Sequence, residues 1–382
     1  MQKIEELQSN KALSVLARSL FTQIFCEFDA FMGALLKTIY LRNTVLLKGI
    51  AREISLTDLL EYQSIDAVKK VLLDKEIETF RRDSYIEQFI QLEKKFVLPL
   101  RKFPEWGEFV ELGQRRNIFT HNDGLVSDQY LQVCDREGHT FLKRPKNGES
   151  LDADIKYFSR AVVVLSKVGF MLAHTLWSKL FPAELEQLDS SMTSTIFNYL
   201  QDKRWRTAGV FAEFSMSEPM RKNISEREVR IRVINLAIAL KFSDRQAEVS
   251  KLLASFDWTA SYRDFKLAIL ILEDKFEEAK VLMETIGKAG ELLTQEGYHT
   301  WPHFTKFRER PDFYVTYEKI YGEPYLTNLP SDTKQPNVSL VIATANVGVS
   351  SPGAQKLSTE KKVSGTKEGS RIVKAKSKNA SP

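Results

Sequence analysis

The chain has 382 residues, of which 43% are hydrophobic, 27% charged and 11% aromatic, and its formal net charge is +5. These values exclude a fibrous or wholly disordered protein and predict two folded domains, because domains usually contain about 100–200 residues. The stretch 328–382 contains nine Lys and Arg against three Asp and Glu, so it carries +6 and the rest of the chain −1. Any phosphate-binding site in the folded part must therefore be local.

Cysteine content and hydropathy indicate the compartment. Cys26 and Cys134 are far apart in the chain and belong to no CxxC pair, which excludes a disulfide framework and a zinc site of that kind. The N-terminus has no signal-peptide pattern, and no window approaches the ~18 consecutive apolar residues that a membrane span needs. We therefore expect a cytoplasmic protein without a membrane segment.

The first half of the chain has a helical pattern. Apolar residues recur at helical spacing over residues 10–47, which predicts one long helix or a helix with one break; this stripe comprises Leu13, Leu16, Leu20, Ile24, Phe28, Phe31, Leu35 and Ile39. A second helical stretch begins at Ser55 and continues to Phe103, with Asp83 and Ser84 as a cap between two segments. Pro104 and Gly124 then bracket a helix over 105–122.

The next segment, 125–148, is rich in Gly, Pro, Asp, Asn and Lys and predicts a loop or a short hairpin. The helical pattern returns over 151–180 and ends at Pro182, where we place the end of a first domain, 1–182. The predicted fold class is all-α, with a helical bundle in this domain.

Residues 183–325 are expected to form a second domain of helical hairpins. A leucine, a charged turn, an aromatic residue and a later alanine occur twice, around Leu200 to Ala208 and around Leu272 to Ala279, with a poorer copy from Leu240. This pattern resembles tetratricopeptide repeats; an unrelated helical bundle is the alternative. The aromatic-rich stretch 299–322 is expected to cap the stack. Residues 326–382, rich in Lys and Ser, are expected to be disordered.

One polar cluster carries the chemistry. On the helix predicted over 105–122, Arg116 falls inside the apolar stripe, where a guanidinium needs an acidic partner, an exit to solvent or a phosphate. Asn117 and His121, four residues apart, share the flank beside it. The arginine could hold a phosphodiester, the histidine could transfer a proton near neutral pH, and the asparagine could orient the imidazole. Alternatively, Arg116 pairs with Glu27 or Asp29, and His121 interacts only with the helix dipole.

The segment Arg115-Arg116-Asn117-Ile-Phe-Thr-His121-Asn-Asp-Gly124 resembles the Arg-Asn-x-x-x-His motif of HEPN-domain proteins (higher eukaryote and prokaryote nucleotide-binding). The resemblance extends over roughly residues 10–180. It implies a helical bundle, and many members are metal-independent endoribonucleases of toxin and phage-defence systems in which two subunits form one composite site. By this resemblance Arg116 holds the scissile phosphate, His121 transfers a proton, Asn117 matches the polar residue after the arginine, and Glu27 or Asp29 is a supporting acid.

The sequence therefore predicts a homodimeric endoribonuclease that uses no metal or cofactor and acts in toxin–antitoxin or antiviral defence. An antitoxin or regulatory protein is expected to bind the C-terminal helical region. The alternative is a non-catalytic scaffold that dimerises and recruits a protein or RNA. Only the endoribonuclease hypothesis predicts a surface groove that Arg116 and His121 line together. His139, His174, His299 and His303 have no acid or cysteine at metal-ligand spacing, and no GxxxxGK[ST], GxGxxG or HExxH motif occurs.

Overall fold

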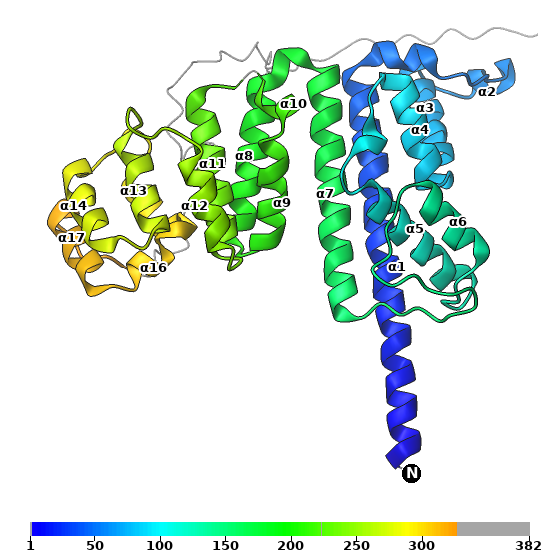
Figure 1. Ribbon diagram of the computed structural model, residues 1–382. Coiled ribbons are helices and arrows are strands. Elements are labelled where there is room, and N and C mark those ends of the chain that lie inside the picture. Colours follow the sequence, from blue (N-terminus) through cyan, green and yellow to red (C-terminus); the bar gives the residue numbers. More distant parts are fainter. Residues whose placement is uncertain (1, 223, 327–382) are drawn as a thin grey trace, which may run out of the picture. The chain divides into compact units, whose positions relative to one another are not determined.

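The computed structural model describes residues 2–222 and 224–326, and within these ranges the protein is all-α, without a β-strand (Figure 1). This confirms the predicted fold class. The expected tail lies, except for its first residue, outside the described residues. The predicted domain boundary near residue 182 stays a prediction, since the described helices on both sides of it belong to one compact unit.

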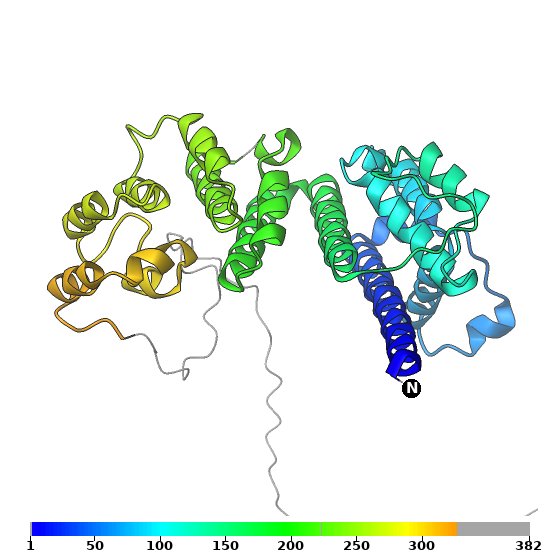
Figure 2. The same ribbon diagram turned by 60° about the horizontal axis from the view of Figure 1, so that its bottom comes forward.

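The first half of the chain is a bundle around two long helices. Its elements are α1 (Gln2–Arg42), η1 (Thr44–Gly49), α2 (Leu56–Leu60), α3 (Ile65–Arg82), α4 (Tyr85–Phe96), η2 (Leu100–Lys102), α5 (Trp106–His121), α6 (Asp128–Arg136) and α7 (Ile155–Leu180). Helices α1 and α7 run side by side in both views (Figure 1, Figure 2), and α1 also contacts α3 and α5. The polar cluster predicted from the sequence thus lies on a helix that packs against the longest helix of the bundle.

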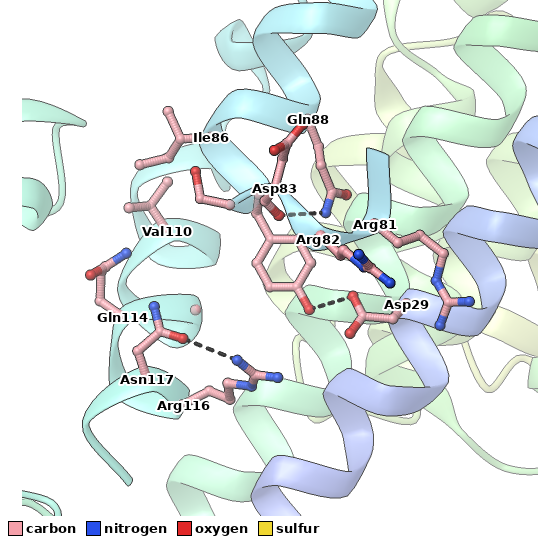
Figure 3. A pocket seen from close by; sticks show the side chains of 13 residues that line it. Asp29, Arg81, Arg82, Asp83, Ile86, Gln88, Val110, Gln114, Arg116 and Asn117 are labelled. Carbon is pink, nitrogen blue, oxygen red and sulfur yellow. Dashed lines mark hydrogen bonds between the residues drawn. The ribbon is translucent and has the colours of Figure 1, made fainter. Parts of the chain in front are cut away.

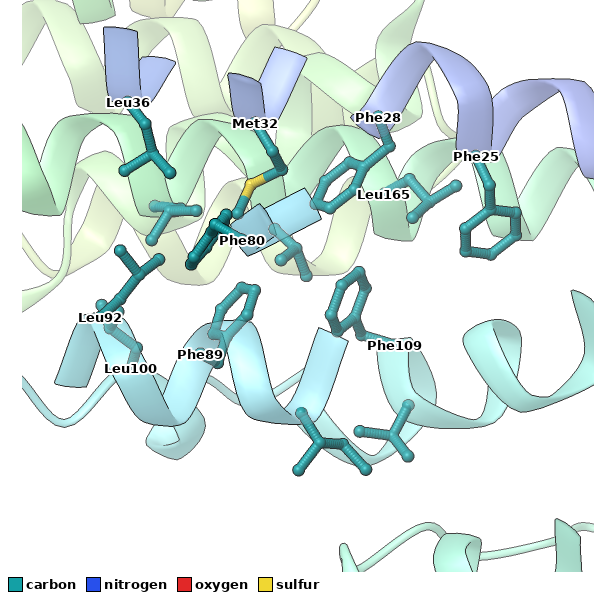
Figure 4. Close-up of a cluster of buried hydrophobic side chains, with 14 of the residues drawn as sticks. Phe25, Phe28, Met32, Leu36, Phe80, Phe89, Leu92, Leu100, Phe109 and Leu165 are labelled. Carbon is teal, nitrogen blue, oxygen red and sulfur yellow. The ribbon is translucent and has the colours of Figure 1, made fainter. Parts of the chain in front are cut away.

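Helix α1 is unbroken, but its buried stripe matches the predicted one only in part: Phe28 and Ile39 are buried, and the half-buried Ile24, Phe31 and Leu35 pack against the core. Leu13, Leu16 and Leu20 are at least half exposed, and the N-terminal part of α1 extends beyond its neighbours (Figure 1). The residues that enter the core are Phe21, Phe25, Phe28, Met32, Leu36 and Ile39. They meet Phe89, Leu92 and Phe109 from α4 and α5 in the aromatic core of the bundle (Figure 4). Both stripes have helical spacing, so the sequence pattern alone could not select the buried one.

The predicted helix starts at Ser55 and Ser84 are confirmed, but the stretch from Ser55 to Phe103 also breaks between α2 and α3, and its last α-helix ends at Phe96. The Ser55 hydroxyl accepts a hydrogen bond from the amide of Asp58 at 3.0 Å, and Ser84 accepts one from Glu87 at 3.3 Å. Asp83 is the C-terminal cap residue of α3. Gly124 lies in the turn that follows α5 with a φ of +78°. This left-handed conformation favours glycine, because a residue with a side chain is strained in it.

The loop predicted over 125–148 contains a helix, α6, so this prediction was wrong in part. The Ser127 hydroxyl accepts from the amide of Tyr130 at 3.1 Å, and Tyr130 and Cys134 are buried one turn apart. A nine-residue amphipathic helix was hidden by the glycines and proline that follow it. The predicted hairpin is reduced to a single antiparallel bridge between Leu125 and Ser150.

Helix α7 contributes to two hydrophobic cores. Val164, Leu165 and Leu172 pack into the bundle core, whereas Phe170 and Met171 pack into the core of the following helices. By length and composition α7 is the one helix among the described residues that could cross a membrane, but more than half of its apolar window is buried inside the protein. It therefore has the character of a core helix.

The second half of the chain consists of helical hairpins and a terminal unit. Its elements are η3 (Pro182–Glu184), α8 (Leu185–Gln201), α9 (Trp205–Ser215), α10 (Glu218–Arg221), α11 (Glu226–Lys241), α12 (Gln246–Ala254), α13 (Arg263–Leu272), α14 (Phe276–Ile286), α15 (Gln295–Thr300), η4 (Pro302–Phe304), α16 (Thr305–Arg308) and α17 (Pro311–Tyr321). The contacting pairs α8–α9, α11–α12 and α13–α14 are joined by short turns.

The three turns share one backbone conformation. Lys203, Asp244 and Asp274 all have a positive φ of 58–59°. In each turn the residue that follows donates its amide to a carbonyl of the preceding helix: Arg204 to Tyr199, Arg245 to Leu240 and Lys275 to Leu270. Ala208 and Ala279 are fully buried at equivalent positions, where the poorer copy has Val249. The three hairpins found in the sequence pattern therefore exist, with uneven spacing along the chain.

Aromatic residues of the predicted terminal unit are indeed core residues, including Phe304, Phe307, Phe313 and Tyr317. Beside them, His303 is buried, and neither of its ring nitrogens has a hydrogen-bond partner among the described residues. Burial, reinforced by the charges of Arg308 and Lys241, lowers the pKa of His303 well below its ordinary value. His174 on α7 shares the direction of this shift, mainly through burial.

We expect the protein to become less stable as the pH falls below about 6.5, the ordinary histidine pKa. A buried histidine with a lowered pKa stays neutral in the folded chain, while the unfolded chain takes up a proton, so acid favours unfolding. His303 alone should lower the free energy of unfolding by about 1–2 kcal/mol between pH 7 and pH 5. Urea unfolding at both pH values should show a smaller loss for His303→Leu. An equal loss in the two proteins would contradict this.

Candidate functional site

Helix α5 places the motif between the core and solvent. Phe109, Leu112 and Ile118 are buried on its inner face, and Trp106 begins the helix inside the same core. Arg116 and Asn117 are half-buried, and His121 is exposed in the last turn. Arg116 and Asn117 thus lie at the edge of the buried face, and His121 lies one turn further on, exposed to solvent.

A hollow of about 420 Å³ opens beside Arg116 and Asn117 (Figure 3). Four helices, α1, α3, α4 and α5, and the cap between α3 and α4 provide its walls. Its charged lining residues are Arg81, Arg82 and Arg116 against Asp29 and Asp83. Because Arg82 pairs with Glu78 on its own helix, Arg81 and Arg116 are the arginines that remain available to an anion in the hollow.

Arg116 has no acidic partner among the side chains that the structure describes, those of residues 12–222 and 224–326. Its Nη1 donates to Oδ1 of Asn117 at 3.2 Å, and its Nε is buried without a hydrogen-bond partner in the same residues. The ion pair with Glu27 or Asp29 that the sequence left open is thus not formed. A buried, unpaired guanidinium nitrogen is costly, so Arg116 has unused capacity to bind a ligand with several oxygen acceptors.

The two candidate acids point in different directions. Asp29 lines the hollow and accepts a hydrogen bond from the Tyr85 hydroxyl at 2.8 Å (Figure 3). Glu27 is exposed, accepts from Gln23 at 3.2 Å, and lines a different cavity beside α7. Because residues two apart on a helix are about 200° apart around its axis, only one of them can face a given neighbour. The structure brings Asp29, and not Glu27, to Arg116 and Asn117.

His121 does not line the hollow. It is exposed at the end of α5, and the chain turns sharply after it through Asn122, Asp123 and Gly124. Arg18 on α1 holds this turn, because its guanidinium donates to the carbonyl of Asp123 at 2.9 Å and to the carboxylate of Asp152 at 3.0 Å. The sequence predicted a groove lined by both Arg116 and His121. In the structure Arg116 lines the hollow and His121 does not.

A buried carboxylate that sequence reasoning missed anchors the helix that carries the motif. Glu111 accepts hydrogen bonds from Tyr130 of α6 at 2.6 Å, from Tyr157 of α7 at 2.7 Å and from Arg115 at 2.9 Å. The guanidinium of Arg115 also lies 4.0 Å from the centre of the Tyr157 ring. Burial, together with the Glu111 charge, raises the pKa of both tyrosines, so they remain neutral donors. The only sequence signal was the pair Glu111 and Arg115 at helical spacing.

Metal ligands do not gather in the described part of the chain: no group there has three or more His, Cys, Asp or Glu side chains that could hold an ion. Cys26 is exposed and Cys134 is buried, and neither is in a disulfide. Comparison with known protein families, with curated proteins and with solved structures found no match to this chain. The assignment of a function consequently depends on the site itself.

Replacing Glu111 by alanine should destabilise the protein by about 3–5 kcal/mol, because Arg115 and two tyrosines would be left buried without their acceptor. Urea unfolding at neutral pH measures this loss. Glu108→Ala is a matched control one turn earlier on α5, since Glu108 pairs with Arg160 near the surface. The control should change stability by at most about 1 kcal/mol. Equal effects of the two substitutions would contradict the role given to Glu111.

Proposed function

We propose that the protein is a metal-independent endoribonuclease of the HEPN type, with Arg116, Asn117 and His121 as its catalytic residues and Asp29 as the supporting acid. The observation that carries the proposal is the guanidinium of Arg116, which has no acidic partner among the described side chains and lies at an open hollow. An arginine in this state suits a phosphodiester, whose two free oxygens match the planar fork of the guanidinium.

The proposed reaction is an internal transesterification. The ribose 2′-hydroxyl attacks the phosphorus, the new bond to O2′ forms as the bond to O5′ breaks, and a 2′,3′-cyclic phosphate remains. Arg116 neutralises the charge that develops on the phosphate oxygens. A histidine removes the 2′ proton or supplies a proton to the leaving O5′, and His121 has the side chain for this step.

The exposed position of His121 outside the hollow favours a composite site. In the family that the motif resembles, two subunits place two motifs face to face, so the histidine of one chain can act beside the arginine of the other. Leu13, Leu16 and Leu20 on α1 are exposed and offer an apolar face for such a homodimer. An antitoxin or regulator would bind the C-terminal hairpins, and the cytoplasm would be the site of action.

The second candidate function is a non-catalytic scaffold that dimerises and recruits a protein or RNA. The same observation, that His121 and Arg116 do not line one hollow within a single chain, favours it. The two functions share the anion-binding arginine and differ in whether RNA is cut.

Purified protein should cut single-stranded RNA in the presence of EDTA and leave 2′,3′-cyclic phosphate ends. Arg116→Ala and His121→Ala should each lower the rate at least about 100-fold, because each removes charge stabilisation or proton transfer from the transition state. Gel analysis of labelled RNA gives the rates, and chemical identification of the 3′ end gives the product.

Gln132→Ala is the control, since Gln132 is an exposed helical residue of the same bundle away from the motif. Its rate should equal that of the unmodified protein. The ribonuclease proposal fails if diverse RNAs stay intact at high protein concentration, or if His121→Ala retains full activity. Intact RNA with an unchanged dimer mass would favour the scaffold.

A further inference from the structure

Two arginines that face the same hollow lack an acidic partner in the described residues. Arg116 comes from α5, and Arg81 comes from the last turn of α3. Their neighbour Arg82 differs, because it pairs with Glu78 one turn earlier on its own helix. Arg81 lies against Gly33 of α1, where an added Cβ would come 3.1 Å from its Cδ. The lack of a side chain at Gly33 thus lets the stem of Arg81 cross α1 towards Asp29 (Figure 3).

The carboxylate nearest to these arginines is already engaged. The Tyr85 hydroxyl donates to Asp29 at 2.8 Å, and Tyr85 itself is half-buried, with its ring against Phe25 of α1 and Phe109 of α5. Its ring packs on Gly113, where an added Cβ would come 3.2 Å from Cδ2 of Tyr85. Gly113 precedes Arg116 by one helical turn, so the ring of Tyr85 lies directly beside the arginine.

Both charged groups act on the same hydroxyl. Burial and the Asp29 carboxylate raise the pKa of Tyr85, and the positive charge of Arg116 opposes this effect. The Tyr85 hydroxyl is therefore a neutral hydrogen-bond donor that interacts electrostatically with both the Asp29 carboxylate and the Arg116 guanidinium. Without it, a half-buried carboxylate and a half-buried guanidinium on facing helices would be expected to form an ion pair.

We propose that Arg81 and Arg116 together bind one phosphate group of the RNA substrate, and that Tyr85 keeps this site open by holding Asp29 away from Arg116. The inference rests on the proposed function and adds two residues to it. Arg81 is a second binding residue, and Tyr85 is a positioning residue that acts through Asp29. Two guanidinium groups on one phosphate match the several acceptor oxygens of that group.

The test uses the full-length protein and two probes, inorganic phosphate and an oligouridylate with 2′-O-methyl groups that cannot be cleaved. Phosphate is titrated at constant ionic strength while the side-chain Nε–Hε signal of Arg116 is followed by NMR, with Arg116→Lys to identify the signal. We expect a saturable shift of this signal, and a weaker apparent affinity for phosphate when the oligonucleotide is present. An apparent phosphate affinity that the oligonucleotide leaves unchanged would contradict an RNA site.

The variants separate the two roles. Tyr85→Phe should weaken phosphate binding about tenfold, the effect of losing one charge-assisted contact, because Asp29 is released to pair with Arg116. Adding Asp29→Asn to Tyr85→Phe should restore binding, since the competing charge is gone. A purely structural role of Tyr85 predicts no rescue, so a double variant as weak as Tyr85→Phe would overturn the proposal, as would a Tyr85→Phe protein with unchanged affinity.

Two matched controls are available. Trp177→Phe removes a bond of the same length, 2.8 Å, from the carboxylate of Glu184, away from the Glu111 network, and should leave phosphate affinity unchanged. Arg81→Ala should weaken binding more than Arg82→Ala, whose guanidinium is paired with Glu78. If Tyr85→Phe fails to fold, Asp29→Asn decides: it should bind phosphate at least as tightly as the unmodified protein, and weaker binding contradicts the proposal.

The outcome is independent of the cleavage assay. Protein that binds phosphate and the oligonucleotide but cuts no RNA would end the ribonuclease proposal and leave the phosphate site standing. Protein that cuts RNA with an unchanged rate in Arg81→Ala and Tyr85→Phe would leave the ribonuclease standing and end this inference.

Discussion

The buried carboxylate of Glu111 determines where the candidate site lies. It draws hydrogen bonds from α6, from α7 and from its own helix, so α5 is held in one rotation about its axis. Because a buried carboxylate is stable only with donors around it, any rotation of α5 would be costly. This rotation keeps Phe109 and Leu112 inside and leaves Arg116 and Asn117 at the edge of the core. Gly113 lines the hollow beside them, and an added Cβ there would come 3.2 Å from the ring of Tyr85.

The site combines charges that are neutralised with charges that are not. Arg115 is saturated by Glu111, Arg18 by Asp123 and Asp152, and Arg82 by Glu78. Arg116, next to Arg115 in the chain, has only the amide oxygen of Asn117 within the described residues. Electrostatics thus distinguish two adjacent arginines that look alike in the sequence: one fastens the bundle, and the other is available to an anion.

Helical periodicity was sufficient to predict the fold class, the capped starts of α2 and α4 and the position of Arg116 and Asn117 at the edge of the core. It failed where two patterns were equally periodic, as for Leu13 and Phe21 on α1, and where Gly and Pro hid the short helix α6. It could also not find Arg81 or Tyr85, because their meeting with Arg116 depends on packing between helices far apart in sequence. Spacing could have separated Glu27 from Asp29, since residues two apart face different sides of a helix.

The central claim is that the free guanidinium of Arg116 binds a phosphate of RNA. A crystal structure of the protein with a 2′-O-methyl dinucleotide tests it most directly. The account predicts a phosphate oxygen within about 3 Å of a guanidinium nitrogen of Arg116, with Asp29 still bonded to Tyr85. A structure in which Arg116 is paired with Asp29 and the phosphate lies elsewhere would contradict it.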